Sequence, residues 1–349
     1  MRNLTALARQ IHASAAPDGW SLDVLADLIA GAGANLIAPA VLFFALGAFA
    51  GWLKSDLNVP DQVAKTLALY LMLCIGFKGG VEAAAAGLSA QMLSAGGLGL
   101  AMSFAAPFLA FSVLRWISKL DRATAAATAA HYGSVSVVTF AAASEYLRAI
   151  GVEFGGYMIA VLALMETPAI LAALVIVGGR AQSGDLGVKP HLWREVLLNG
   201  AALMLVGSFI IGVLTGERGM TRLEVFVGPL FQGALCLFLL EMGLVVSRRM
   251  AAAPRLNLGL VGFALIWPVL GALTALACAR FLGLSLGDAT LMAVLAASAS
   301  YIAAPAAMRM ALPQADAGIY VSLSLGVTFP FNLLVGIPLY YALARIVWG

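Results

Sequence analysis

The residues best suited to chemistry are hydroxyl and glycine residues that interrupt two otherwise apolar stretches. The first stretch reads His131-Tyr-Gly-Ser-Val-Ser-Val-Val-Thr139 and the second reads Ser298-Ala-Ser-Tyr-Ile-Ala-Ala-Pro305. Hydroxyl oxygens suit a hard cation, and a helix that restarts after a break presents N–H groups and partial positive charge to an anion. The pattern predicts a site for sodium and a small anion. Its candidate residues are Gly133, Ser134, Ser136, Thr139, Ser298, Ser300 and Tyr301.

A simpler interpretation is that small and hydroxyl side chains let helices pack closely. That interpretation accounts for either stretch alone. It accounts less well for two interruptions in matching halves of a chain, because backbone groups freed inside a membrane need a cavity or a bound solute to satisfy them. Paired interruptions are typical of transporter binding sites.

Ionisable residues within apolar stretches form a second group of candidates, because each needs a partner or a wet cavity. Lys78 has the alternative of an i,i+4 ion pair with Glu82, and Glu241 that of a helix–helix hydrogen bond when protonated. His131 is interpreted as a satisfied residue of the helix bundle. The motifs Glu166-Thr-Pro168 and Thr328-Phe-Pro330 interrupt two further stretches. The predicted ion-binding or gating residues are Glu166, Thr167, Thr328, Lys78 and Glu241.

The elements that must position these residues are membrane-spanning helices. Hydrophobic residues make up 62% of the 349 positions and charged residues 11%, which is far more apolar than a soluble domain. A helix needs about 20 apolar residues to cross a bilayer. We therefore expect an all-α polytopic membrane protein with ten spans, near 34–53, 63–80, 94–117, 123–145, 155–178, 194–215, 225–247, 257–281, 287–310 and 317–347.

The ten predicted spans divide into two similar halves. Residues 42–51 align with 207–216 through two glycine pairs, Gly76 aligns with Gly243, 123–124 align with 289–290, and Pro168 aligns with Pro330. Because five spans is an odd number, the second half enters the membrane from the opposite side, which predicts an inverted repeat with discontinuous spans four and nine. The predicted segments are an interfacial segment at 1–30, repeats at 31–178 and 193–349, and a cytoplasmic linker at 179–192.

Charge distribution predicts the orientation, and motif content narrows the function. Of the 20 Lys and Arg residues, twelve fall on the side that holds the linker, which places that side in the cytoplasm and both termini outside. The cysteines at 74, 236 and 278 lie in apolar stretches and are interpreted as buried hydrophobes. No phosphate-binding loop, metal-ligand spacing or nucleic-acid signal is present, so an enzyme is not expected and no cofactor is predicted beyond a coupling sodium ion.

The same stretches resemble the sodium-dependent bicarbonate transporter family best known from the cyanobacterial carbon-concentrating mechanism. The resemblance covers essentially the whole chain after residue 30. It is carried by residues 75–80, 131–140, 165–170, 295–302 with Pro305, and 337–339. Well-known members carry an acidic residue after the second serine run, where this chain has Tyr301.

The resemblance implies an inner-membrane symporter of sodium and bicarbonate, with ten helices in core and gate subdomains. It also implies a homotrimer and a possible regulator of the signalling-protein PII type. By the resemblance, Ser136 and Thr139 match the first broken helix, and Ser298 and Ser300 the second. Two alternatives stay open, namely transport of another small carboxylate or organic anion, and a membrane sensor that keeps the fold without transport.

Overall fold

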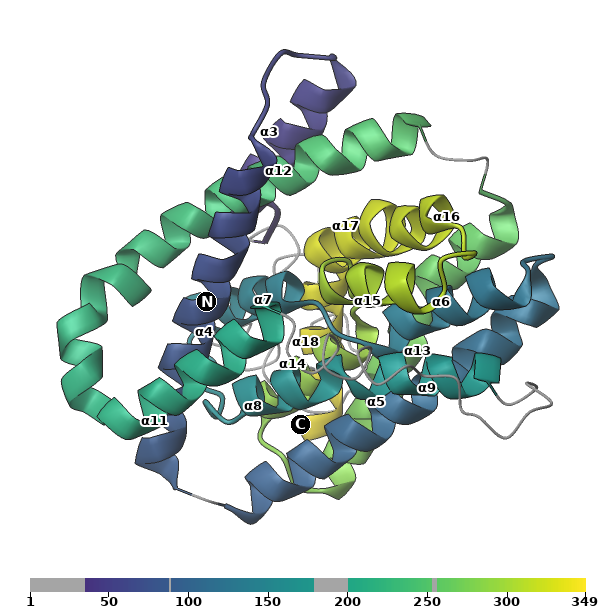
Figure 1. The fold of residues 1–349 in the computed structure, drawn as a ribbon. Helices are drawn as coiled ribbons and strands as arrows, with labels where there is room; N and C mark the ends of the chain where they lie inside the picture. The colour runs from purple at the N-terminus through teal and green to yellow at the C-terminus, as the bar shows by residue number, and fades with distance from the viewer. Residues whose placement is uncertain (1–34, 88, 179–199, 253–255) are drawn as a thin grey trace, which may run out of the picture.

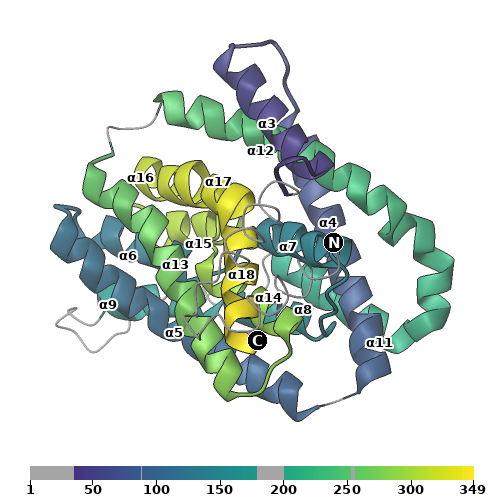
Figure 2. The same ribbon diagram turned by 180° about the vertical axis from the view of Figure 1, so that it is seen from behind.

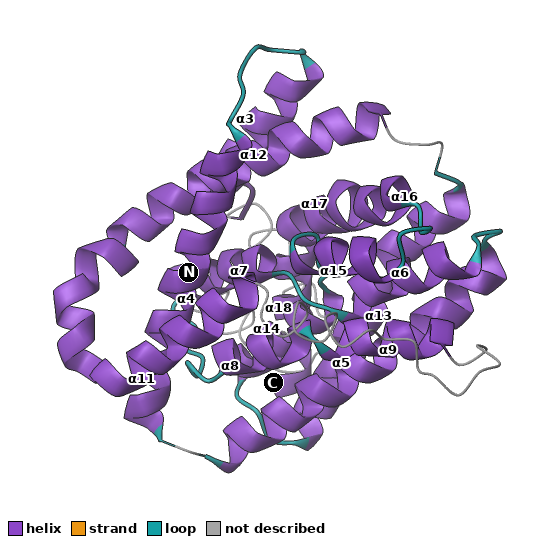
Figure 3. Ribbon diagram, in the orientation of Figure 1, coloured by secondary structure: helices purple, strands orange, loops and turns teal. Residues whose placement is uncertain are grey.

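The structure, a computed structural model, describes residues 35–87, 89–178, 200–252 and 256–349. Within these ranges the regular elements are all helices, and no strand occurs (Figure 3). The elements are α3 (Pro39–Trp52), α4 (Asp61–Ala86), α5 (Ala90–Ile117), α6 (Arg122–Gly133), α7 (Val137–Ala149), α8 (Met158–Glu166), α9 (Pro168–Gly178), α11 (Gly200–Val227), α12 (Pro229–Ala252), α13 (Leu258–Phe281), α14 (Leu286–Ala297), α15 (Ala303–Ala311), α16 (Ala317–Val321), η1 (Ser322–Thr328), α17 (Phe329–Phe331), η2 (Asn332–Gly336) and α18 (Ile337–Trp348).

Seven helical segments are long and apolar enough to cross a membrane, which makes this a multi-pass membrane protein. They account for seven of the predicted spans. The other three predicted spans, near 34–53, 123–145 and 287–310, contain the 14-residue α3 and the pairs α6–α7 and α14–α15. The seven segments are Asp61–Ala85, Ala90–Ile117, Met158–Val177, Leu203–Val227, Pro229–Met250, Leu258–Phe281 and Ala317–Trp348.

The helices form two groups that lie side by side. In Figure 1, α3, α4, α11 and α12 make an outer frame on the left and top, and Figure 2 shows the same frame from behind. The remaining helices pack into a second group, in which α14, α15 and α18 lie near the centre, with α16 and α17 above them and α6 to the right in Figure 1. The most extensive contacts in the frame are α11 against α4 and α12 against α3.

Glycines bring the frame helices into close contact. A Cβ atom added at Gly47 of α3 would lie 1.9 Å from the Leu240 carbonyl oxygen, and one at Gly243 of α12 would lie 2.1 Å from the Phe44 carbonyl oxygen. The second crossing is built the same way, because an added Cβ at Gly212 of α11 would lie 2.2 Å from the carbonyl oxygen of Phe77 in α4. Small residues permit this backbone approach, which supplies packing energy where lipid provides no hydrophobic drive.

We expect Gly243→Ala to lower the melting temperature of the detergent-solubilised protein. The new methyl group meets backbone rather than a movable side chain, and overpacking of this kind costs about 1–3 kcal/mol. Gly233→Ala is the matched control on the same helix, because nothing lies within 4 Å of its added Cβ. Equal melting temperatures for the two variants would contradict the close-approach interpretation of α3 and α12.

Two predicted features differ in form from the expectation. The sixth span was expected to end at 215, but α11 continues to Val227 through a kink at Gly216, whose φ of 53° favours glycine. Span ten was expected to break at Pro330, but helical turns continue through it as the π-helical segments η1 and η2, which accommodate the missing proline N–H without a break. The predicted segments 1–30 and 179–192 lie outside the described residues.

Candidate functional site

The predicted spans four and nine are both broken, and serine hydroxyl groups accept N–H groups at the helix starts, Ser136 at α7 and Ser300 at α15. Helix α6 ends at Gly133, Ser134 is extended, and α7 restarts behind Ser136, whose Oγ accepts the N–H of Thr139 at 3.2 Å. An added Cβ at Gly133 would lie 2.4 Å from Pro107 Cγ, so only glycine lets this helix end rest on α5. In span nine, α14 ends at Ala297 and α15 restarts at Ala303.

The two breaks are hydrogen-bonded to one another. The Ser136 N–H donates to Ser298 Oγ at 3.0 Å, although the residues lie 162 positions apart. The Ser300 N–H donates to the His131 carbonyl oxygen at 2.9 Å. All three serines and the histidine are buried. The C-terminal ends of α6 and α14, which carry partial negative charge, therefore meet the positively polarised N-terminal ends of α7 and α15.

Glu166, the last residue of α8, lies beside this crossing. It is 3% exposed, and its backbone carbonyl accepts the Ser134 hydroxyl at 3.2 Å. Among the described residues its Oε2 atom has no hydrogen-bond partner, and the same is true of the buried Tyr301 hydroxyl. Buried polar atoms in native structures are normally bonded. Two buried oxygens without partners therefore lie beside the breaks.

A second buried carboxylate shows what a satisfied acidic group looks like in this protein. Asp288, in the first turn of α14, accepts the Gly155 N–H, the Tyr157 hydroxyl and the Ser285 hydroxyl, each at 2.7 Å. These donors tie α14 to the segment before α8, which is a structural role. Among the described residues no donor reaches Glu166 Oε2, so Glu166 differs from a carboxylate with a purely structural role.

Glu166 and Tyr301 share a small cavity with both breaks. Its volume is about 10 Å³, which suffices for one water-sized particle. The lining is Met72, Val135, Ser136, Val137, Glu166, Ser300, Tyr301 and Ile302. An ion without its hydration shell fits such a space, whereas an anion with four heavy atoms does not.

A comparison with protein families bears on this arrangement. Residues 39–345 match the model of the Na+-dependent bicarbonate transporter superfamily. The chain belongs to this superfamily. No individual curated protein matches the chain in sequence. The match includes both breaks, Glu166 and all the described helices except the last three residues of α18.

Two of the predicted residues of this superfamily member take structural roles instead. Thr328 lies away from the cavity and is buried. Its hydroxyl donates to the Ala264 carbonyl oxygen at 2.7 Å, and the Tyr132 hydroxyl donates to it at 2.7 Å. Thr167 is the single residue between α8 and α9, and its carbonyl accepts the Ile170 N–H at 3.1 Å. Neither side chain lines the cavity.

Two charged candidates also lie elsewhere. The Lys78 amine sits over the Phe231 ring, 5.0 Å from its centroid, and an ion pair with Glu82 is not formed, because Glu82 pairs with Arg148 at 3.6 Å. Glu241, on α12, has Arg248 and Asp61 as its electrostatic neighbours. Both residues belong to the frame helices and do not line the cavity at the breaks, whereas Lys78 lines a second small cavity together with Ser144 and Arg148.

Sequence reasoning missed one residue that supports the crossing. The Asn332 amide donates to the carbonyl oxygen of Ala297, the last residue of α14, at 2.8 Å, and Asn332 is itself held by the Tyr340 hydroxyl at 2.7 Å. An amide in span ten close behind Pro330 was the available signal. His131 contributes its backbone as a bundle residue should, yet its Nε2 atom is buried without a partner.

Proposed function

We propose that this protein is a secondary transporter that moves bicarbonate or a similarly small anion together with sodium. The observation that carries the proposal is the pair of hydrogen-bonded helix breaks beside the orphan carboxylate of Glu166. Membership of the Na+-dependent bicarbonate transporter superfamily supports the choice of ion and substrate. Transport, rather than an enzymatic reaction, is the chemistry that broken helices at membrane depth serve.

The proposed cation position is the small cavity itself. Glu166 supplies a negative charge there, and Ser136, Ser300 and Tyr301 offer hydroxyl oxygens around the same space. Oxygen ligands of this kind suit a hard cation, and a buried carboxylate without a partner gains from a bound charge. In this proposal Glu166 does the work of the acidic residue that the resembled family has at the position of Tyr301.

The proposed anion position is at the starts of α7 and α15, where partial positive charge and N–H groups favour an anion. The described conformation leaves room for one small ion only. We therefore propose that it is a closed state and that the anion enters when the frame helices move relative to the second group. Such a movement is how broken-helix transporters alternate access.

We also propose the ten-span inverted repeat, and two symmetric sets of contacts support it. The crossing of α3 with α12 and the crossing of α11 with α4 exchange under the repeat, and each uses close-packed glycines. The contacts of α5 with α6 and of α13 with α14 exchange in the same way. Four further properties are also proposals. The placement of both termini outside follows from the distribution of Lys and Arg residues, and the inner-membrane location, the homotrimer and a PII-type partner follow from the resemblance.

The test is uptake of labelled bicarbonate into proteoliposomes with and without an inward sodium gradient. We expect uptake to need the gradient and to be competed by bicarbonate more strongly than by formate, acetate or nitrate. Uptake at the same rate with and without the sodium gradient would show that sodium is not the coupling ion. Sodium-dependent binding without flux would instead favour the membrane-sensor alternative, and stronger competition by a carboxylate would favour the organic-anion alternative.

An ion-pair cluster is proposed to hold the described closed state. Arg148, at the end of α7, lies 3.6 Å from Glu82 of α4 and 2.9 Å from Glu145, and Gln232 of α12 donates to Glu145 at 3.2 Å. These contacts join the frame helices to the second group. Arg148 and Ser144 line a small cavity beneath them.

We expect Arg148→Ala to raise the reaction rate of a cysteine placed at position 144 with a membrane-impermeant thiol reagent. The reaction rate should rise roughly fivefold, because a partly exposed ion pair contributes up to about 1 kcal/mol. High salt should reduce the difference between the two proteins, because it screens the ion pair when Arg148 is present. The native cysteines 74, 236 and 278 are first replaced by alanine. Arg222→Ala, on the exposed surface of α11, is the control, and an equal rise in both variants would rule out the cluster as a gate.

A further inference from the structure

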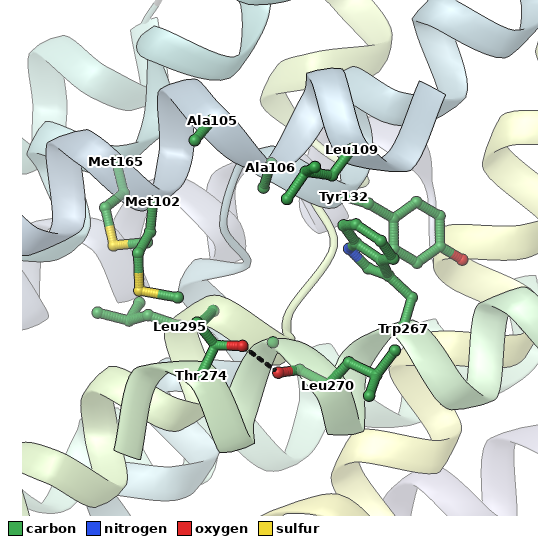
Figure 4. A pocket seen from close by; sticks show the side chains of 13 residues that line it. Met102, Ala105, Ala106, Leu109, Tyr132, Met165, Trp267, Leu270, Thr274 and Leu295 are labelled. Atoms are coloured by element: carbon green, nitrogen blue, oxygen red, sulfur yellow. Dashed lines mark hydrogen bonds between the residues drawn. The ribbon is translucent and has the colours of Figure 1, made fainter. Parts of the chain in front are cut away.

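A second cavity, on the opposite side of the broken helices, has no part in the proposed ion site. Figure 4 shows it between α5 and α13, with Met102, Ala105, Ala106 and Leu109 on one wall and Trp267, Leu270 and Thr274 on the other. Its volume is about 370 Å³. We call this cavity the α5–α13 groove.

The groove is apolar because its hydroxyl groups are already used. The Thr274 hydroxyl donates to the Leu270 carbonyl oxygen of its own helix at 2.8 Å, the dashed line in Figure 4. The Tyr132 hydroxyl turns away and donates to Thr328 at 2.7 Å. The other lining side chains are almost all alanine, leucine and methionine. A charged or strongly polar ligand would lose its hydration there without compensation.

The groove opens toward the lipid at the middle of the membrane. Leu109 is 62% exposed and Leu270 is 51% exposed at its rim. The walls, residues 102–109 and 267–274, occupy the centres of the segments Ala90–Ile117 and Leu258–Phe281. The centre of a spanning helix lies in the hydrocarbon core of the bilayer. The surrounding medium at this depth is therefore acyl chain, not water or headgroup.

The floor of the groove is formed by the ends of both broken helices. Gly133 is the last residue of α6, and Leu295 and Ala296 belong to the last turn of α14. Met165 precedes Glu166, and Gly271 of α13 is pressed so closely on the Ala296 carbonyl oxygen that an added Cβ would lie 2.5 Å away. A molecule in the groove would therefore contact the last residues of α6 and α14, next to both breaks.

We propose that the α5–α13 groove binds one acyl chain of a membrane lipid, and that the bound chain restrains the ends of α6 and α14. The binding follows from the shape, depth and apolar lining of the groove. The restraint follows from its floor, since movement of either break would change the walls around the chain. The effect on transport rests on the proposed function, whereas the binding itself does not.

Tryptophan fluorescence tests the binding directly, because Trp267 lines the groove. A full-length variant whose only tryptophan is Trp267 is placed in bilayers of phosphatidylcholine brominated near the end of the acyl chain or near the headgroup. We expect chain-end bromine to quench Trp267 more strongly. Filling the groove by Ala106→Leu should largely remove that quenching. Trp116, 87% exposed on α5, serves as the only tryptophan in the control protein, whose quenching should not respond to Ala106→Leu.

Three results would overturn the proposal. Quenching of Trp267 could be unaffected by Ala106→Leu and by a second groove-filling variant, Ala105→Leu. Both variants are first shown to have the melting temperature of the unfilled protein. Trp267 could be unquenched by either lipid. Trp267 could be unquenched while Ala106→Leu lowers the mass of the purified protein because an oligomer dissociates. That result would mean that the groove is a contact between copies of the chain.

A transport measurement separates this inference from the proposed function. If both hold, Ala106→Leu changes the rate of sodium-driven uptake and leaves the sodium concentration for half-maximal uptake unchanged. If neither the wild-type protein nor Ala106→Leu takes up bicarbonate, the proposed function is wrong. The quenching experiment still decides whether the groove binds an acyl chain. If uptake is normal and does not respond to groove filling, the restraint on the breaks is wrong.

Discussion

Ser298→Ala is expected to lower sodium-driven bicarbonate uptake by about tenfold to a hundredfold. The substitution leaves the buried Ser136 N–H without its acceptor, and an unsatisfied buried donor costs about 1–3 kcal/mol, where about 1.4 kcal/mol corresponds to a factor of ten. The lost bond is one of the two that join the broken helices, and the Ser300–His131 hydrogen bond stays in place. The measurement is the initial rate of uptake in proteoliposomes.

Two variants control this experiment. Ser298→Thr keeps the hydroxyl group and should restore much of the rate. Ser112→Ala removes an exposed hydroxyl on α5 that bonds only to the Phe108 carbonyl oxygen of its own helix, and it should leave uptake unchanged. Wild-type uptake by Ser298→Ala would mean that the hydrogen bond between Ser136 and Ser298 is dispensable for transport, which would contradict the proposed role of this bond.

Glu166→Gln is expected to raise the sodium concentration for half-maximal uptake by more than about tenfold. The amide keeps the shape of the side chain and removes its charge, and the attraction between unit charges about 4 Å apart near a protein surface is about 4 kcal/mol. Sodium-induced thermal stabilisation should disappear with it, because a ligand that binds only the folded state stabilises by mass action. Both quantities are measured on the purified protein.

Asp288→Asn is the control for Glu166→Gln, because it should change the melting temperature and not the sodium response. It disturbs a carboxylate that accepts three hydrogen bonds, so we expect a lower melting temperature with the sodium response retained. Glu166→Gln should keep the wild-type melting temperature or raise it, since an unpaired buried charge is costly. An unchanged sodium response in Glu166→Gln would place the coupling charge at another residue.

Several features of the site could be predicted from residue types. The positions of both breaks follow from glycine, serine and proline inside apolar stretches, where continued helix is disfavoured. Glu166 was identifiable because a carboxyl group in a span needs a reason to be there. Asn332 carried the same kind of signal, a buried amide within the last span, but nothing in its neighbourhood indicated that it would reach the end of α14.

Other features depended on how the helices face one another. Lys78, Glu241 and Thr328 lie within predicted spans, as Glu166 does, but none of them lines the cavity at the breaks. Lys78 lies over the Phe231 ring, Glu241 has Arg248 and Asp61 as its electrostatic neighbours, and Thr328 donates to the Ala264 carbonyl oxygen. Hydropathy reports whether a residue lies within the membrane, but a residue's direction around its helix axis depends on the neighbours that the helix packs against. Tyr301 was a candidate from the sequence, but only the structure places it in the same cavity as Glu166.

The sequence by itself determined that this chain spans a membrane many times, that two of its helices break, and which family it resembles. These properties depend on local composition and on residue order along the chain. Only the tertiary structure decided that the breaks touch, that Glu166 lacks a partner, and that an apolar groove lies behind both. Those properties depend on contacts between residues more than a hundred positions apart, which form only when the glycine-lined helices pack together.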